Sequence, residues 1–279
     1  MTLRMTLRTG RHVLLALAFF AFPAPGSFAE DVSGPDAWLD RLGRVAGLYH
    51  DTALKFASDE EITGTGLPTP CRFEYIYVYS ASQGLRDYRT LPGRQREVDP
   101  GACRIPQFLR RAYSWVFVFA ADARKHHRYA IAGEDEALGR AAIKISFEPI
   151  PPFRRGVNEW FGTAWVDRET SQILKVEALQ HEEHRKQEEI EKDLASPAGG
   201  ARLHGKHRAI ERVTTEFSVE KNGMRFPGRA LILRTDFKIP GEAAPFDEST
   251  VYRIEQNYTH YRFYGVRTKE EIRAIVQGK

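Results

Sequence analysis

Residues 158–180 narrow the choice of fold more than any other part of the sequence. Residues 160–166 are aromatic and β-prone, as a half-buried strand requires. Residues 167–172 are polar and typical of a turn. Alternation then resumes, which predicts Leu174, Val176 and Ala178 on one face of a second strand. The pattern indicates a β-hairpin and hence an antiparallel sheet, but no particular chemistry.

The N-terminus has the pattern of an export signal. Arg4, Arg8 and Arg11 precede an apolar run at 13–22, and residues 27–29 offer a small-x-small cleavage site. We expect cleavage after Ala29 (a signal peptide at 1–29) and export, with the periplasm as the expected location. An uncleaved anchor is the alternative. It is disfavoured because the apolar run is about half of the roughly 20 residues that span a bilayer. The mature chain is therefore expected to have no transmembrane span.

Charge argues against a nucleic-acid partner. The chain has a net charge of +4, but the first 29 residues hold three arginines and no acidic residue or lysine, so the mature chain carries +1. Such a small excess of positive charge does not indicate the basic surface that nucleic-acid binding requires. Hydrophobic residues make up 42% of the chain, so residues 30–279 are able to bury the core of a single domain.

Two cysteines, Cys71 and Cys103, lie in the mature part. In an oxidising compartment an isolated pair usually forms one disulfide, which is the expectation here. Two unpaired structural thiols are the alternative. A catalytic role is not expected, because the sequence has no C-x-x-C pair.

An amphipathic helix is expected at 36–62, after the start signal Pro35-Asp36. Its apolar residues recur every three or four positions: Leu39, Leu42, Ala46, Tyr49, Ala53 and Phe56. Two aromatic strands are expected next, at 71–80 and 113–119, separated by a long polar connection at 83–111.

Later strands are expected at 128–132, 142–147, 212–221, 224–239 and 251–264. Asn222-Gly223 indicates a two-residue turn, because both residues tolerate positive φ. Thr268 and Glu271 form a capping box for a short C-terminal helix. Residues 181–208 are densely charged and are expected to form a mobile insert that is partly helical at most.

These elements predict an α+β fold. We expect a strongly curved antiparallel sheet, a half-open barrel, covered by the N-terminal amphipathic helix. A short C-terminal helix completes the domain.

The sequence carries no nucleophile elbow, P-loop or dinucleotide fingerprint, so no catalytic residue and no cofactor is expected. Two H-x-x-H pairs, His181/His184 and His204/His207, flank the charged stretch and would hold a metal if they converged. The preferred interpretation is that these histidines are solvated polar residues, with no metal bound.

The aromatic residues of the two strands are the other candidate site. They are Phe73, Tyr75, Tyr77 and Tyr79 in the first strand and Tyr113, Trp115, Phe117 and Phe119 in the second. Such residues are able to line a pocket for an apolar ligand. The competing and preferred interpretation is that they only fill the core, because a sheet face must be buried in either case.

The central hairpin resembles the periplasmic lipoprotein-carrier superfamily (LolA/LolB-like). The residues that carry the resemblance are Trp165, Val166, Asp167, Arg168, Glu169, Thr170, Leu174, Val176 and Glu177, supported by Asn222 to Pro227 and by Tyr258, Tyr261 and Arg262. The resemblance implies a half-open β-barrel with an apolar cavity that receives acyl chains. It transfers no site residue.

The resulting hypothesis is a non-enzymatic exported protein that binds a lipid or a lipoprotein acyl chain on its curved sheet. The alternative is an envelope interaction or signalling module with a filled core and a protein partner. A metal-dependent enzyme that uses the His181–His207 region is the third possibility.

Overall fold

The computed structural model describes residues 34–50, 54–80, 84–94, 96–103, 107–155, 157–195, 207–238, 247–265 and 267–278, all within the unit Ser33–Lys279. The predicted export signal and its cleavage site lie outside the described residues. No helix in the described part is long and apolar enough to cross a membrane.

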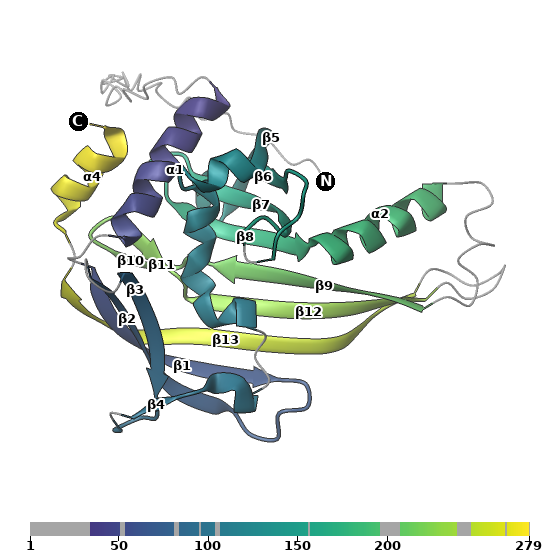
Figure 1. The fold of residues 1–279 in the computed structure, drawn as a ribbon, viewed down its shortest axis with the longest axis horizontal. Helices are drawn as coiled ribbons and strands as arrows, with labels where there is room; N and C mark the ends of the chain where they lie inside the picture. The colour runs from purple at the N-terminus through teal and green to yellow at the C-terminus, as the bar shows by residue number, and fades with distance from the viewer. Residues whose placement is uncertain are drawn as a thin grey trace, which may run out of the picture. The chain divides into compact units, whose positions relative to one another are not determined.

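Most strands belong to one large sheet (Figure 1). These strands are β1 (Lys55–Gly64), β2 (Cys71–Ser80), β3 (Gly84–Thr90), β4 (Glu97–Val98), β5 (His127–Ala137), β6 (Arg140–Pro149), β7 (Trp160–Asp167), β8 (Ile173–Gln180), β9 (His207–Glu216), β12 (Arg229–Lys238) and β13 (Asp247–Gly265). A second sheet pairs β10 (Val219–Lys221) with β11 (Met224–Phe226). The helical elements are α1 (Pro35–Tyr49), η1 (Pro100–Cys103), η2 (Gln107–Phe119), η3 (Ala123–His126), α2 (His181–Ala195) and α4 (Lys269–Gln277).

The large sheet has the order β4-β3-β2-β1-β13-β12-β9-β8-β7-β6-β5. Its pairings are antiparallel, and β13 is inserted between β1 and β12. The order does not close on itself, and the sheet is visibly curved in Figure 1. The predicted curved antiparallel sheet is confirmed as an unclosed sheet.

The central hairpin is formed by β7 and β8, as predicted. A register shift at Trp165/Val166 interrupts the expected alternation, and Leu174 joins a buried cluster with Trp165, Ala137 and Ala142. Val176 and Ala178 follow the predicted pattern and are buried.

The two faces of the sheet are covered by different helices. We call the face beneath η2 the inner face; cross-strand pairing places Phe147, Gly162, Ala178 and Val213 together on it. Side chains alternate along a strand, so Leu179 and Ile210 point to the opposite, outer face. There they pack with Ile190 of α2.

The predicted helix at 36–62 is wrong in its second half. α1 ends at Tyr49, and residues Lys55–Gly64 form β1, in which Phe56, Ser58, Glu60 and Ile62 are buried on one face. The acidic run in β1 concealed this two-residue period. Cover of the sheet by the N-terminal helix is not confirmed: α1 packs chiefly on η2 and α4.

The predicted strand at 113–119 is also wrong, because these residues form most of the 3₁₀ helix η2. Aromatic residues favour strands because they fit a half-buried surface. In this protein the aromatic side chains of residues 113–119 pack on such a surface from a helix, so the strand prediction fails. The expected polar connection at 83–111 likewise contains β3, where Asp87 and Arg89 are buried despite their charge.

Several smaller predictions are confirmed. Cys71 and Cys103 form a disulfide with a Cα–Cα distance of 6.3 Å. Asn222 and Gly223 have φ values of 52° and 82° at the β10–β11 turn. Thr268 and Glu271 form the capping box of α4.

The stretch expected to be a mobile insert at 181–208 begins with the fifteen-residue helix α2 and ends inside β9. Residues 196–206 lie outside the described part. Ion pairs along α2, such as Arg185 with Glu189 at 2.6 Å, explain why so charged a stretch is helical.

Candidate functional site on the inner face of the sheet

The predicted aromatic residues do contact one another, but one set lies on strand β2 and the other on the helix η2 that covers the sheet. Phe73, Tyr75 and Tyr77 lie on β2 and are 0–7% exposed, and the rings of Tyr77 and Tyr113 are 4.7 Å apart. Tyr113, Trp115 and Phe119 of η2 are also buried, whereas Phe117 is partly exposed and stacks on His50. The side chain of Tyr79 lies outside the described part.

The cover η2 crosses the sheet and contacts both of its halves (Figure 1, teal). The guanidinium of Arg111 pairs with Asp87 of β3 at 3.0 Å, and the indole N–H of Trp115 donates to Thr215 Oγ1 of β9 at 2.9 Å. Near its end, Phe119 packs edge-on against Phe147 of β6.

η2 has an unusual backbone for a buried element. It is a run of 3₁₀ turns broken at Arg111, whose φ and ψ are −132° and 64°. Runs of 3₁₀ helix longer than three or four residues are uncommon, because their hydrogen-bond geometry is poorer than that of an α-helix. Side-chain contacts with the sheet therefore hold η2 in place more than its own backbone hydrogen bonds do.

The inner face is polar beneath the first half of η2. Cross-strand pairing places Ser58 and Glu60 of β1, Tyr75 of β2 and Arg89 of β3 on this face. The guanidinium of Arg89 pairs with the carboxylate of Glu60, and the two side chains are 3% and 0% exposed. The Gln256 amide donates to the same carboxylate at 2.7 Å.

Burial is the largest single influence on the pKa values of this polar cluster. It acts to lower the pKa of Arg89, but the hydrogen bonds and charge of Glu60 more than offset it, so the pKa is raised. Burial raises the pKa of Asp87, although Arg111 and Arg89 act in the other direction. The pKa of Tyr258 is raised well above 10, first by burial and then by the charge of Glu60.

Four buried polar atoms in or beside the cluster make no hydrogen bond of good geometry within the described part of the chain. They are Ser58 Oγ, Tyr113 OH, Gln256 Oε1 and Tyr258 OH. Three of them still lie beside a polar side chain: Tyr258 beside Glu60, Tyr113 beside Asp87, and Ser58 beside Tyr261. Each buried polar atom without a partner costs about 1–3 kcal/mol, so a core that only filled space would be expected to avoid them.

The inner face is apolar beneath the second half of η2. Here Ile145, Val176, Val213, Ile232 and Ile254 are all buried, with 0–1% of their surface exposed. Gly162 leaves room for the ring of Phe147, since a Cβ at this position would lie 2.4 Å from the ring. Polar and apolar areas therefore adjoin on one surface, as in the binding site of an amphiphilic molecule.

The histidine candidates do not form a metal site within the described part, where no group of three or more potential ligands occurs. His181 and His184 lie on α2. The ring of His181 lies tilted against Phe153 with centroids 3.8 Å apart, and His184 stacks on Phe161 at 3.9 Å. His204 and the side chain of His207 lie outside that part.

Comparisons with known proteins give structural neighbours only. No protein-family model matches the chain, and no curated protein matches it. A DUF1329 family protein from Desulfovibrio piger is 11% identical with a TM-score of 0.43, and the match covers 85% of this chain and 96% of that one. A putative outer membrane lipoprotein-sorting protein domain from Vibrio parahaemolyticus is 8% identical with a TM-score of 0.40, over 85% and 97% of the two chains.

A LolA superfamily protein from Nitrosomonas europaea is 11% identical, with a TM-score of 0.35, over 81% of this chain and 93% of its own. The solved structures that match this chain thus include one that is named for the superfamily that the hairpin sequence resembles.

Sequence reasoning missed the polar half of the site. Glu60 falls within the helix predicted at 36–62, and Arg89 within the predicted polar connection at 83–111. The available signal was weak: Asp87 and Arg89 are opposite charges two positions apart, one on each side of Tyr88. Only the register between β1, β2 and β3 brings Glu60 and Arg89 together.

Proposed function

We propose that this is a non-enzymatic exported envelope protein that binds a lipid, or the acyl chain of a lipoprotein, on the inner face of its sheet. The acyl chain would take the place of the aromatic side chains of η2 over the apolar half. The polar head of the ligand would lie at the polar half, beside Glu60 and Arg89.

The observation that carries this proposal is the set of buried polar atoms beneath η2 that make no hydrogen bond of good geometry within the described part of the chain. A ligand headgroup would supply the missing partners of Ser58, Gln256 and Tyr258. It would offset a cost that the ligand-free protein bears. The proposed ligand-binding residues are the aromatic residues of β2 and η2: Phe73, Tyr75, Tyr77, Tyr79, Tyr113, Trp115, Phe117 and Phe119.

Two observations support export. The disulfide between Cys71 and Cys103 suits an oxidising compartment such as the periplasm. The N-terminal sequence has the pattern of a secretory signal.

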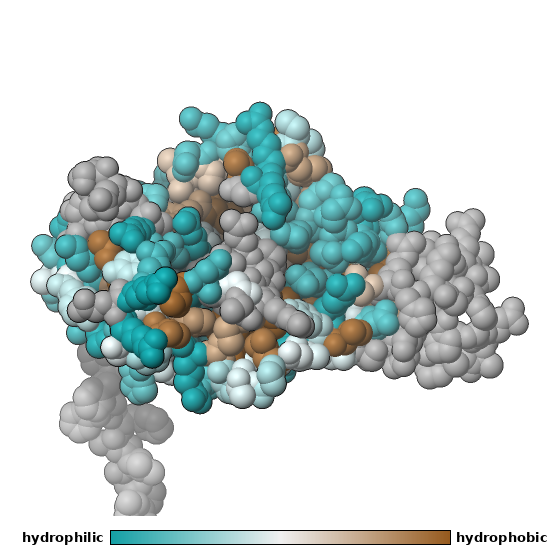
Figure 2. Space-filling model, turned by 60° about the horizontal axis from the view of Figure 1, so that its bottom comes forward, coloured by the Kyte–Doolittle hydropathy of each residue, from teal (hydrophilic) through white to brown (hydrophobic). Residues whose placement is uncertain are grey.

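The tight packing of the inner face favours a second candidate, an interaction or signalling module without a small ligand. Tyr77 and Tyr113 are 0% and 1% exposed, as in a core that is already filled. Such a module needs a surface for its partner. On the face shown in Figure 2, hydrophobic side chains form small separated patches among hydrophilic ones.

Native mass spectrometry with Tyr258→Phe distinguishes the two candidates. We expect the mature protein, purified without detergent, to form a one-to-one complex with a lysophospholipid. Tyr258→Phe removes a hydroxyl that makes no hydrogen bond of good geometry, so it should leave folding intact while weakening the complex about tenfold, or about 1.4 kcal/mol.

Tyr264→Phe is the matched control. Tyr264 lies on the same strand and is 69% exposed, so loss of its hydroxyl should leave both stability and lipid binding unchanged. The absence of any complex with the wild-type protein would contradict the proposal and favour the second candidate.

A further inference from the structure

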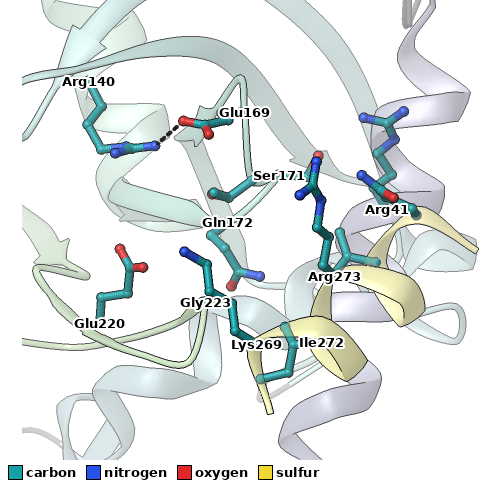
Figure 3. A pocket seen from close by; sticks show the side chains of 13 residues that line it. Arg41, Arg140, Glu169, Ser171, Gln172, Glu220, Gly223, Lys269, Ile272 and Arg273 are labelled. Carbon is teal, nitrogen blue, oxygen red and sulfur yellow. Dashed lines mark hydrogen bonds and ion pairs between the residues drawn. The ribbon is translucent and has the colours of Figure 1, made fainter. Parts of the chain in front are cut away.

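A separate pocket lies away from the inner face, where the C-terminal helix meets the turn of the central hairpin (Figure 3). Its walls come from α1, from the β7–β8 turn, from the β10–β11 turn and from α4. Its volume is about 230 Å³, which is room for roughly eight water molecules and therefore for a small ligand.

The charges in this pocket are unbalanced toward positive. Its lining contains four basic and two acidic residues: Arg41, Arg140, Lys269, Arg273, Glu169 and Glu220. Both acidic residues already have partners, since Glu169 pairs with Arg140 at 2.9 Å and Glu220 pairs with Arg225 at 3.1 Å.

Lys269 and Arg273, one turn apart on α4, make no ion pair within the described part of the chain. Both side chains extend to the pocket in Figure 3. Two unneutralised cations at one small pocket favour a negatively charged ligand.

The β7–β8 turn adds polar groups on the opposite wall. Gln172 is only 2% exposed, and its side chain lines the pocket. Next to it, Ser171 is 1% exposed, and Thr170 Oγ1 is buried without a partner. Buried polar groups are normally hydrogen-bonded, so these groups indicate a site built for a polar ligand atom.

The pocket also has an apolar wall. Ile272 and Val276 of α4 line it beside the two cations. The two side chains are only 2% and 5% exposed, so they offer a small apolar surface that suits a short tail.

We propose that this pocket binds a small organic anion, a carboxylate or a phosphate that carries a short apolar tail. Lys269 and Arg273 pair with the anionic group, the amide of Gln172 donates to it, and the tail packs on Ile272 and Val276. This site is independent of the lipid site on the inner face, so either is able to exist without the other.

Methyl NMR of the mature protein tests this site with three probes: hexanoate, hexyl phosphate and inorganic phosphate. We expect both tailed anions to shift the Ile272 methyl resonance in a saturable way, with a Kd of about 1 mM or tighter. Inorganic phosphate should bind at least about tenfold more weakly, because it has no tail. An unchanged Ile272 resonance, or equal binding of hexyl phosphate and inorganic phosphate, would overturn the proposal.

Two double variants that remove the same charge test whether the anion binds in this pocket or is only attracted by the net positive charge of the protein. Lys269→Ser/Arg273→Ser should abolish the shift, and Gln172→Met should weaken binding. Arg94→Ser/Lys125→Ser removes two exposed cations elsewhere and should bind as the wild type does. Equal loss of binding in both double variants, or wild-type binding by the pocket double variant, would show that the pocket is not the site.

Discussion

Arg89 donates two hydrogen bonds to the carboxylate of Glu60, from Nε and from Nη2, the latter at 2.7 Å, in the interior of the sheet. The residues are 29 positions apart and belong to β1 and β3, with β2 between them. The guanidinium also lies 5.1 Å from the ring centre of Tyr75. An ion pair is thus held among aromatic rings beneath η2.

Breaking this ion pair on one side should destabilise the protein. Arg89→Met leaves the Glu60 carboxylate buried without its counter-charge, and we expect the free energy of unfolding to fall by about 3–5 kcal/mol. Urea denaturation measures the change. In the double variant Glu60→Gln/Arg89→Met most of the loss should be recovered, and equal loss in both variants would show that the pair itself stabilises the fold.

The disulfide should contribute through the unfolded chain. It joins residues 32 positions apart, and closing a loop of this length stabilises a protein by about 3–4 kcal/mol. We expect Cys71→Ser/Cys103→Ser to unfold at a correspondingly lower urea concentration. Wild-type protein unfolded in the presence of a reductant should match the variant, and identical midpoints with and without the bridge would contradict this account.

His127 should make the protein less stable in mild acid. Burial lowers its pKa from 6.5, and its Nδ1–H donates to Ala123 O at 3.1 Å. A depressed folded-state pKa contributes stability above about pH 6.5, and this stability is lost as the pH falls through the folded pKa. His126, the adjacent residue, acts in the same direction.

The test for His127 compares unfolding free energies at about pH 8 and about pH 5. His127→Asn keeps a donor for Ala123 O but does not titrate in this range. Its stability should therefore fall less than that of the wild type on acidification. An equal fall in both proteins would exclude His127 as the source.

Asp167 should be essential for the turn of the central hairpin. Its carboxylate accepts hydrogen bonds from the backbone N–H groups of Glu169 and Thr170 at 2.8 Å and 3.1 Å, and pairs with Arg140. Asp167→Ala removes these bonds and should lower the free energy of unfolding by about 2–4 kcal/mol. Glu169→Ala removes only an exposed ion pair and should change it by less than about 1 kcal/mol.

Sequence periodicity predicted those parts of the fold in which local and tertiary preferences agree. The hairpin of β7 and β8, the Asn222-Gly223 turn and the capping box at Thr268 each follow from residues within a few positions of one another. These signals are local, and the sheet was predictable from them.

The candidate site was harder to predict, because it depends on register between distant strands. Glu60 and Arg89 read as surface residues until β1, β2 and β3 are aligned. Trp115 and Phe119 read as strand residues, and only their contacts with Thr215 and Phe147 explain why they lie on a 3₁₀ cover.

The central claim is that a lipid replaces η2 on the inner face, and 5-fluorotryptophan NMR tests it most directly. The chain has four tryptophans. Trp115 bonds to Thr215 and packs edge-on against Trp160, whereas Trp165 bonds to Asp135 and Trp38 lies on α1. On titration with a lysophospholipid, we predict that the Trp115 and Trp160 resonances move together while that of Trp165 stays unchanged. Four unchanged resonances at saturating lipid would contradict the account.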